Sequence, residues 1–313
     1  MDQYRGNRVA VILPCYNEAP AIASVVAGFR AALPEAAIYV FDNASTDTTA
    51  EVARAAGATV ISVTHRGKGN VVRRMFADVE ADIYLMADGD GTYDPGAARQ
   101  MIDTLLAGGL DMVVGCRVAS GSGEYRFGHK FGNRALTRAV ARIFGDGFTD
   151  MLSGYRALSR RYVKSFPALS KGFEIETELT IHALELRAPH GEVSTAYGER
   201  TAGTVSKLST WGDGSRIAGT ILRLHMLERP LEFYLTLALV GLFVSLGLGL
   251  PVIAEYLQTG LVPRFPTAIA AVGFMLGALL SAAVAVILDG IVTGRREAKR
   301  LVYLGIPATR AAP

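Results

Sequence analysis

The sequence predicts an α/β protein with a mostly parallel sheet and flanking helices, followed by two membrane-spanning helices. Two observations support this prediction. In the first half of the chain, short apolar runs alternate with segments whose apolar residues recur at helical spacing. Strands that alternate with helices indicate a parallel sheet. Near the end of the chain, two uncharged stretches each have about the 20 residues that a helix needs to cross a bilayer.

Five apolar runs are expected to form the strands of the sheet. They cover residues 9–15, 38–41, 59–63, 83–87 and 112–115. The helices expected between them cover residues 19–33, 46–56, 68–79 and 95–106. Ser45 is suited to cap the second helix, Gly57 to end it, and Pro95 stands in the first turn of the fourth. Residues 120–128 resemble a Gly- and Ser-rich loop, and residues 131–144 a further helix.

Composition and charge exclude several classes of protein. The chain has 313 residues, enough for one large domain and an appendage, and its net charge of +3 is too small to indicate a nucleic-acid partner. Its two cysteines, Cys15 and Cys116, form no Cys-x-x-Cys pattern, so neither a zinc site nor a disulfide framework is expected. Free thiols fit a reducing compartment. Residues 1–8 are polar and lack the core of a signal peptide.

The two uncharged stretches, residues 233–254 and 267–288, are expected to be transmembrane helices rather than a pair of buried core helices. Basic residues cluster at their outer ends, and the loop between them has only Arg264. These basic residues are Arg216, Arg223 and Arg229 before the first span and Arg295, Arg296, Lys299 and Arg300 after the second. Because positive residues stay on the cytoplasmic side, both termini are expected in the cytoplasm.

The domain organisation follows from these features. We expect a cytoplasmic α/β domain over residues 1–210, an amphipathic segment on the membrane surface over 211–230, a helical hairpin over 231–292 and a basic cytoplasmic tail over 293–313. The amphipathic segment is indicated by apolar residues at helical spacing beside arginines, although a core-facing helix has the same pattern. The protein would then be an integral protein of the plasma membrane, or of the inner membrane in a bacterium.

Polar or glycine-containing segments follow all five expected strands. They are Pro-Cys-Tyr-Asn-Glu at 14–18, Asp-Asn-Ala-Ser-Thr-Asp at 42–47, Gly-Lys-Gly at 67–69, Asp-Gly-Asp at 88–90 and Gly-Cys-Arg at 115–117. Taken singly, Asn17 could cap a helix, Asp42 could form a turn and Lys68 could be solvated. However, parallel strands end at one edge of the sheet, where open α/β sheets bind ligands. Together the segments predict a site at that edge.

Within that edge, Asp88 and Asp90 are the best candidates for metal binding. Two carboxylates this close repel each other unless a cation lies between them. Oxygen ligands suit Mg²⁺ or Mn²⁺, which often share their coordination shell with substrate phosphates. Gly89 and Gly91 carry no side chain, which would let a phosphate approach the backbone. A solvated Asp-Gly turn is the simpler alternative.

In this order, the segments resemble the family 2 glycosyltransferases of the GT-A fold. Residues 150–156, Asp-Met-Leu-Ser-Gly-Tyr-Arg, resemble that family's Asp-x-x-Ser-Gly-Phe/Tyr-Arg segment. Arg200 and the run Gly-Thr-Val-Ser-Lys at 203–207 resemble the Arg…Gly-x-Ser-Lys segment of the polyprenyl-phosphate sugar transferases, the dolichyl-phosphate mannose synthase group. Several members of that group also have two C-terminal membrane helices.

The resemblance implies a role for individual residues. Asp88 and Asp90 would hold Mg²⁺ or Mn²⁺, and the catalytic residues would be Asp90, Arg117 and Asp150. Residues that would bind the nucleotide sugar are Pro14, Tyr16, Glu18, Phe41, Asp42, Lys68, Asp88, Gly89, Asp90 and Arg117. Residues that would bind the diphosphate or the acceptor's phosphate are Arg117, Arg156, Arg200 and Lys207.

The sequence departs from the family pattern in three places. Asn43 stands where the family often has a second acid, so only Asp42 is carried over as a base or ribose contact. The Asp-x-Asp segment continues Gly-Thr-Tyr-Asp, where mannosyl enzymes tend to have Leu/Gln-His-Pro, which weakens a prediction of GDP-mannose. The Gln-x-x-Arg-Trp motif of processive synthases is missing, and Trp211 lacks its context.

The resemblance therefore implies a metal-dependent, inverting transferase that moves one sugar from a UDP- or GDP-sugar to undecaprenyl or dolichyl phosphate at the cytoplasmic membrane face. A phosphate acceptor is mostly dianionic at neutral pH and needs positive charge more than a base. Asp150 would then orient Arg117 or Arg156, whereas with a hydroxyl acceptor it would be the base. A transferase acting on another lipid or glycan hydroxyl, and a membrane scaffold with an inactive nucleotide-binding domain, are the alternatives. The sequence does not specify the sugar, and it leaves both a monomer and a homo-oligomer open.

Overall fold

The computed structural model describes residues 3–119, 147–172, 174–198, 222 and 225–310. The chain forms two compact units. The first comprises Met1–Gly214 together with Ala298–Pro313, and the second comprises Ser215–Glu297. The first unit therefore ends close to the predicted boundary at residue 210, but it also includes the end of the chain.

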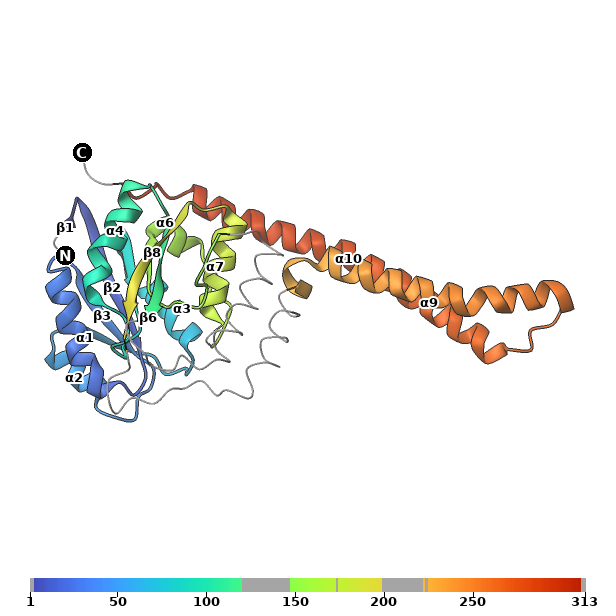
Figure 1. The fold of residues 1–313 in the computed structure, drawn as a ribbon, viewed down its shortest axis with the longest axis horizontal. Coiled ribbons are helices and arrows are strands. Elements are labelled where there is room, and N and C mark those ends of the chain that lie inside the picture. Colours follow the sequence, from blue (N-terminus) through green and yellow to red (C-terminus); the bar gives the residue numbers. More distant parts are fainter. Residues whose placement is uncertain (1–2, 120–146, 173, 199–221, 223–224, 311–313) are drawn as a thin grey trace. The chain divides into compact units, whose positions relative to one another are not determined.

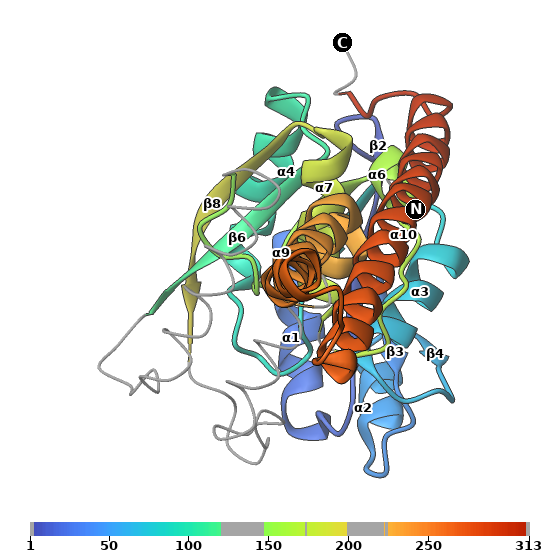
Figure 2. The ribbon, with the colours of Figure 1, turned by 90° about the vertical axis from the view of Figure 1, so that its right-hand side faces the viewer.

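A mixed sheet organises the first unit. Its strands are β1 (Gln3–Tyr4), β2 (Asn7–Cys15), β3 (Ala37–Asp42), β4 (Thr59–Ser62), β5 (Ile83–Met86), β6 (Met112–Ala119), β7 (Arg156–Ser159) and β8 (His190–Tyr197). Their order is β4-β3-β2-β5-β7-β6-β8, with β1 added antiparallel to the start of β2. The pairs among β2 to β5 are parallel, as is β6 with β8 (Figure 2), while β7 runs antiparallel to both of its neighbours. The prediction of an α/β fold with a mostly parallel sheet is confirmed.

Helices cover both faces of this sheet (Figure 1). On one face lie α1 (Ala19–Ala32), α2 (Thr49–Ala55) and α4 (Ala98–Ala107), the last preceded by the 3₁₀ turn η1 (Pro95–Ala97). On the other lie α3 (Lys68–Asp78), α6 (Arg160–Ser165) and α7 (Ile175–Leu186). Alternate residues of β2, such as Val11 and Leu13, pack with Ile22 and Val26 of α1 in one buried cluster. This burial fixes the positions at which the strands end.

Some features of this unit differ from the sequence-based expectation, and other elements, including β1, β8, α6 and α7, were not anticipated. α2 begins at Thr49 rather than residue 46, because the Asp47 carboxylate accepts hydrogen bonds from the backbone amides of both Thr49 and Ala19. The short strand β7 was not anticipated, since its sequence Arg-Ala-Leu-Ser gives no apolar run. The loop expected at 120–128 and the helix expected at 131–144 lie outside the described residues.

The second unit contains two long helices, α9 (Pro230–Thr259) and most of α10 (Phe265–Leu304). Both are long and apolar enough to cross a membrane, and they contain the predicted spans, so they are candidate membrane spans. Small residues bring them together: Ser245 Oγ donates to the carbonyl of Ala271 at 2.8 Å, and a Cβ at Gly241 would lie 3.3 Å from that of Ala278. Large apolar side chains face outward, including Phe243, which is 70% exposed. Such exposure suits contact with lipid.

The end of α10 belongs to the first unit and contacts its α/β fold. Tyr303 donates to the buried Asp111 carboxylate, which also accepts from the Arg161 guanidinium. That guanidinium lies 4.7 Å from the centre of the Tyr303 ring, and Lys299 pairs with Glu185 at 2.9 Å. The predicted basic tail 293–313 is therefore helical as far as Leu304 and is partly held by specific contacts. The amphipathic segment expected at 211–230 lies mostly outside the described residues.

Candidate active site

The five strands predicted from the sequence all run in the same direction. β2 pairs in parallel with β3 and β5, and β3 with β4, while β6 has the same direction because β7 is antiparallel to both β5 and β6. Their carboxyl ends therefore meet at one edge, as expected. In the register of β2 and β3, Cys15 pairs with Asp42, which places the segments that follow these strands next to each other.

At the end of β3, Asp42 and Asn43 have different roles. Asp42 is buried, and its Oδ1 has no hydrogen-bond partner among the described residues. Asn43 donates from Nδ2 to the carbonyls of Val63 and His65, while its Oδ1 accepts from the amide of Gly67 at 2.7 Å. An aspartate could not donate to those carbonyls. The amide at position 43 thus holds the loop after β4, and Asp42 retains an acceptor for a ligand.

The other residues predicted to form the nucleotide pocket lie at different depths. Pro14 and Tyr16 are partly exposed at the end of β2, and the guanidinium of Arg66 lies 5.0 Å from the centre of the Tyr16 ring. Glu18 is buried and precedes α1, where its amide donates to Thr49. Phe41 is fully buried, and its ring points to the opposite face from Asp42 because side chains alternate along a strand. The expected contact of Phe41 with the nucleotide sugar stays a prediction.

Lys68, at the start of α3, lies between two carboxylates. Its Nζ is 2.5 Å from Oδ1 of Asp88, at the end of β5, and 2.5 Å from Oε1 of Glu176, in the first turn of α7. The lysine and glutamate side chains are almost entirely buried, whereas the aspartate is partly exposed. Burial alone would lower the pKa of Lys68, but the two carboxylates raise it above its ordinary value. The ammonium is therefore a fixed positive charge at this edge.

Close backbone approaches explain the glycines around this lysine. A Cβ at Gly69 would lie 2.1 Å from the carbonyl oxygen of Ser170, so this position has no room for a side chain. At Gly154 a Cβ would lie 3.0 Å from Oδ2 of Asp88 and 3.1 Å from Nζ of Lys68. A Cβ at Gly89 would lie 2.3 Å from the Cys15 sulfur. The glycine of the Asp-x-Asp segment is thus required by packing against β2.

Asp90 is oriented by its own turn. Its Oδ1 accepts from the amide of Thr92 at 3.1 Å and from the Thr92 hydroxyl at 2.6 Å. Among the described residues, no cluster of three or more His, Cys, Asp or Glu side chains forms a complete metal site. A pair of carboxylates nevertheless fits Mg²⁺ or Mn²⁺, since these ions take few protein ligands when substrate phosphates and water supply the others. Asp88 and Asp90 are the residues that would hold such an ion.

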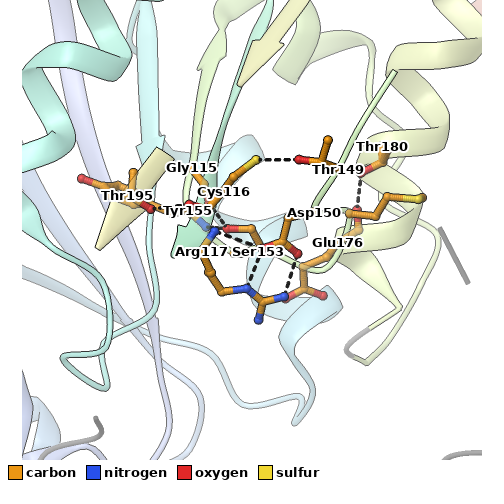
Figure 3. Close-up of polar contacts among 12 residues, drawn as sticks. Gly115, Cys116, Arg117, Thr149, Asp150, Ser153, Tyr155, Glu176, Thr180 and Thr195 are labelled. Carbon is orange, nitrogen blue, oxygen red and sulfur yellow. Dashed lines mark hydrogen bonds and ion pairs between the residues drawn. The ribbon is translucent and has the colours of Figure 1, made fainter. Parts of the chain in front are cut away.

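Arg117 and Asp150 form a bidentate pair near the end of β6 (Figure 3). Arg117 Nε donates to Oδ2 and Nη2 to Oδ1, both at 2.7 Å, and the backbone amide of Arg117 adds a third bond to Oδ2 at 3.2 Å. The guanidinium also lies 5.5 Å from the centre of the Tyr197 ring. Glu192 of β8 accepts from both the amide and the hydroxyl of Thr149, which secures the loop before Asp150. Asp150 therefore orients Arg117.

Arg156, predicted to bind phosphate, is instead part of the core. It is fully buried, and its guanidinium donates to the carbonyls of Ser153, Met151 and Glu176 and to the Thr180 hydroxyl. Burial lowers the pKa of this guanidinium from its ordinary value. Because its donors bind these acceptors, Arg156 supports the loop at residues 151–153 and the first turn of α7. The expectation of a phosphate contact is corrected.

Arg200 and Lys207 lie outside the described residues, so their expected phosphate contacts stay predictions. Glu176, Thr92 and Tyr93 were not anticipated. Tyr93 is buried and accepts from the amide of Gly154 at 2.8 Å, and burial raises the pKa of its hydroxyl. Only the position of Thr92, two residues after Asp90 in a turn, was a usable signal.

Comparison with known sequences identifies the family. Residues 10–166 match the family described as "Glycosyl transferase family 2". The chain belongs to glycosyl transferase family 2. It is 34% identical over 274 residues to the glycosyltransferase AglJ of Haloferax volcanii, covering 87% of this chain and 90% of AglJ. It is 28% identical over 229 residues to the dolichyl-phosphate hexose transferase of the same organism, covering 73% of this chain and 99% of that protein.

The fold of this glycosyltransferase also resembles a solved enzyme. Glucosyl-3-phosphoglycerate synthase from Mycobacterium tuberculosis, crystallised with Mn²⁺, UDP-glucose and phosphoglyceric acid, matches with a TM-score of 0.57 and 28% identity. The match covers 70% of this chain and 79% of that one. The predicted GT-A fold is confirmed, and the chain is a glycosyltransferase with relatives that use polyprenyl phosphates.

We predict that Arg156→Lys destabilises this glycosyltransferase. A lysine ammonium cannot reproduce the planar fork, so buried carbonyls lose their donor, and disrupting such a buried charged network costs about 3 kcal/mol or more. Thermal unfolding of the full chain in detergent should show a clear fall in Tm, with the exposed Arg74→Lys as control. An unchanged Tm combined with a selective loss of lipid-phosphate binding would restore the role as a phosphate ligand.

Proposed function

We propose that this glycosyltransferase moves one sugar, with inversion, from a nucleoside diphosphate sugar to a polyprenyl phosphate at the cytoplasmic face of a membrane. The observation that carries the proposal is the arrangement of charge at the sheet edge. Two acids suited to a divalent ion, Asp88 and Asp90, follow β5. Two cations held by acids lie beside them in the fold: Lys68 at the start of α3 and Arg117 near the end of β6. Such a site suits a reaction in which both donor and acceptor carry phosphate.

The donor side is supported by Asp42 and by the relatives. The unpartnered Oδ1 of Asp42 can accept a hydrogen bond from the nucleoside. Tyr16, which follows β2 at the same edge of the sheet, provides an aromatic ring for the base. Lys68 and Arg117 would bind the diphosphate. When bound at Asp88 and Asp90, a divalent ion would neutralise the diphosphate and make the nucleoside diphosphate a better leaving group. The structural relative crystallised with UDP-glucose and Mn²⁺ favours a UDP-sugar.

The acceptor side is supported by the state of Asp150. In the reaction, an oxygen of the lipid phosphate forms a bond to the anomeric carbon, and the bond from that carbon to the diphosphate breaks. A phosphate monoester is largely dianionic at neutral pH and needs no proton removed. Both oxygens of Asp150 already accept hydrogen bonds from Arg117. An acid engaged in this way is better suited to orient a cation than to deprotonate a hydroxyl. The name of the dolichyl-phosphate hexose transferase points to the same acceptor class.

We expect Asp90→Asn to reduce turnover by roughly a hundredfold or more, the scale for removing one preorganised electrostatic group. The loss should come with weaker Mn²⁺-dependent binding of the nucleotide, measured by calorimetry, and with an unchanged thermal unfolding profile. The Asp78→Asn variant, on the far end of α3, serves as control. Full activity in excess EDTA would contradict metal dependence.

The acceptor class is tested by a ranking of variants. Arg117→Ala should lose at least as much activity as Asp150→Asn, roughly a hundredfold or more. Arg117→Lys should recover little, because lysine cannot replace a bidentate fork. Single-turnover kinetics with polyprenyl phosphate should be compared for these variants and for Arg74→Ala, an exposed control. An inactive Asp150→Asn beside a nearly normal Arg117→Ala would indicate a hydroxyl acceptor that needs deprotonation.

We also predict the orientation of the hairpin. Basic residues at the outer ends of α9 and α10, and the single Arg264 between them, favour a cytoplasmic location for both termini. Reporter fusions at either terminus should then report the cytoplasm, and one inserted at 258–261 should report the opposite side. A cytoplasmic signal from the inserted reporter would reject the hairpin.

A further inference from the structure

Glu176 is a buried acid that no recognised motif contains. It lies in the first turn of α7, its side chain is only 6% exposed, and Oε1 contacts the Lys68 ammonium at 2.5 Å. Its other oxygen, Oε2, is buried with no hydrogen-bond partner among the described residues. A buried carboxylate with an unsatisfied oxygen opposes folding. A role limited to stability would therefore be better filled if apolar residues replaced both Glu176 and its buried partner Lys68.

Glu176 gives the Lys68 ammonium a second acidic partner besides Asp88. The lysine side chain is long and flexible, and Asp88 is its other acidic partner. Asp88 is also a candidate metal ligand, so binding of donor and metal would draw its carboxylate away from the ammonium. Glu176 provides an anchor that does not depend on the donor. With it, Lys68 keeps its place while Asp88 changes partner.

Glu176 is itself held firmly. Its backbone carbonyl accepts from Nη2 of the buried Arg156 at 3.0 Å and from the Thr180 hydroxyl at 3.1 Å. The backbone of Gly154 also comes close to the ammonium, since a Cβ at this position would lie 3.1 Å from Nζ of Lys68. The ammonium is thus confined from three elements of the fold.

We propose that Glu176 is a positioning residue for the donor, holding the Lys68 ammonium where it binds the diphosphate. The inference rests on the proposed function, because it requires a nucleoside diphosphate at this edge. It assigns Glu176 an indirect role: the carboxylate acts through Lys68 and makes no contact with the donor. Removing either partner should therefore affect the same interaction.

The experiment measures binding of UDP and UMP to the full chain in detergent with Mn²⁺, by calorimetry. Glu176→Gln should weaken UDP binding by about tenfold to a hundredfold, the range for a hydrogen bond between charged groups. UMP binding should change little, so the preference for UDP over UMP should fall. Lys68→Met should do the same, and the double variant should be no weaker than Lys68→Met alone. Glu174→Gln, an exposed acid two residues away, is the matched control.

Several outcomes would overturn the inference. Equal losses for UDP and UMP, or a similar loss in Glu174→Gln, would indicate a general disturbance of α7. A further loss in the double variant would mean that Glu176 contacts the donor directly. If Glu176→Gln fails to fold, Lys68→Met still decides, since an unchanged preference for UDP in that variant rejects the idea. A wild-type chain that binds neither UDP nor GDP would reject the proposed function, whereas normal UDP binding by Glu176→Gln would reject this inference alone.

Discussion

The hydrogen bonds of the buried Arg156 guanidinium support both ion pairs of the site, Arg117 with Asp150 and Lys68 with Glu176. It donates to the carbonyls of Met151 and Ser153, in the loop that carries Asp150, and to that of Glu176. The loop positions the partner of Arg117, and α7 positions the partner of Lys68. A buried arginine is unfavourable unless its donors are satisfied, so the backbone around it must take one conformation. The need to satisfy the buried donors of Arg156 therefore fixes the geometry of the residues at the sheet edge.

That geometry gives each cation an acid from a separate part of the chain. Arg117 of β6 is held by Asp150, and Lys68 of α3 by Glu176 and Asp88. Ordered charges of this kind do not have to reorganise when a diphosphate binds, which is what makes preorganised sites effective. The pairing also keeps cations at a buried edge without a ligand, because opposite charges nearby favour the ionised forms. These ion pairs therefore stabilise the buried cations before the donor binds, and they hold the same cations in position for the diphosphate.

The strand ends could be predicted from sequence, whereas the contacts behind them could not. Asp42, Asp88 and Arg117 follow apolar runs, and the shared direction of parallel strands was enough to bring them to one edge. β7 was missed because a strand buried between two others needs no period-two pattern, and only four residues form it. Arg156 was misjudged because a motif arginine has the same sequence signature whether it faces a phosphate or the core. Glu176 could not be found, since its partner Lys68 is distant in the chain and only the fold brings them together.

The basic residues of the C-terminal helix illustrate how one set of side chains can satisfy two constraints. Arg295 pairs with Glu228 at 2.7 Å in the second unit, and Lys299 pairs with Glu185 at 2.9 Å in the first. Residues that the sequence suggested only as orientation signals thus also make specific contacts. The orientation argument survives this pairing, because the bias depends on Lys and Arg during insertion, and acidic residues contribute little to it. In the folded chain, Lys299 and Tyr303 hold the end of α10 against the α/β fold. The same stretch is therefore predicted to set the orientation of the hairpin and is seen to make contacts that stabilise the α/β domain.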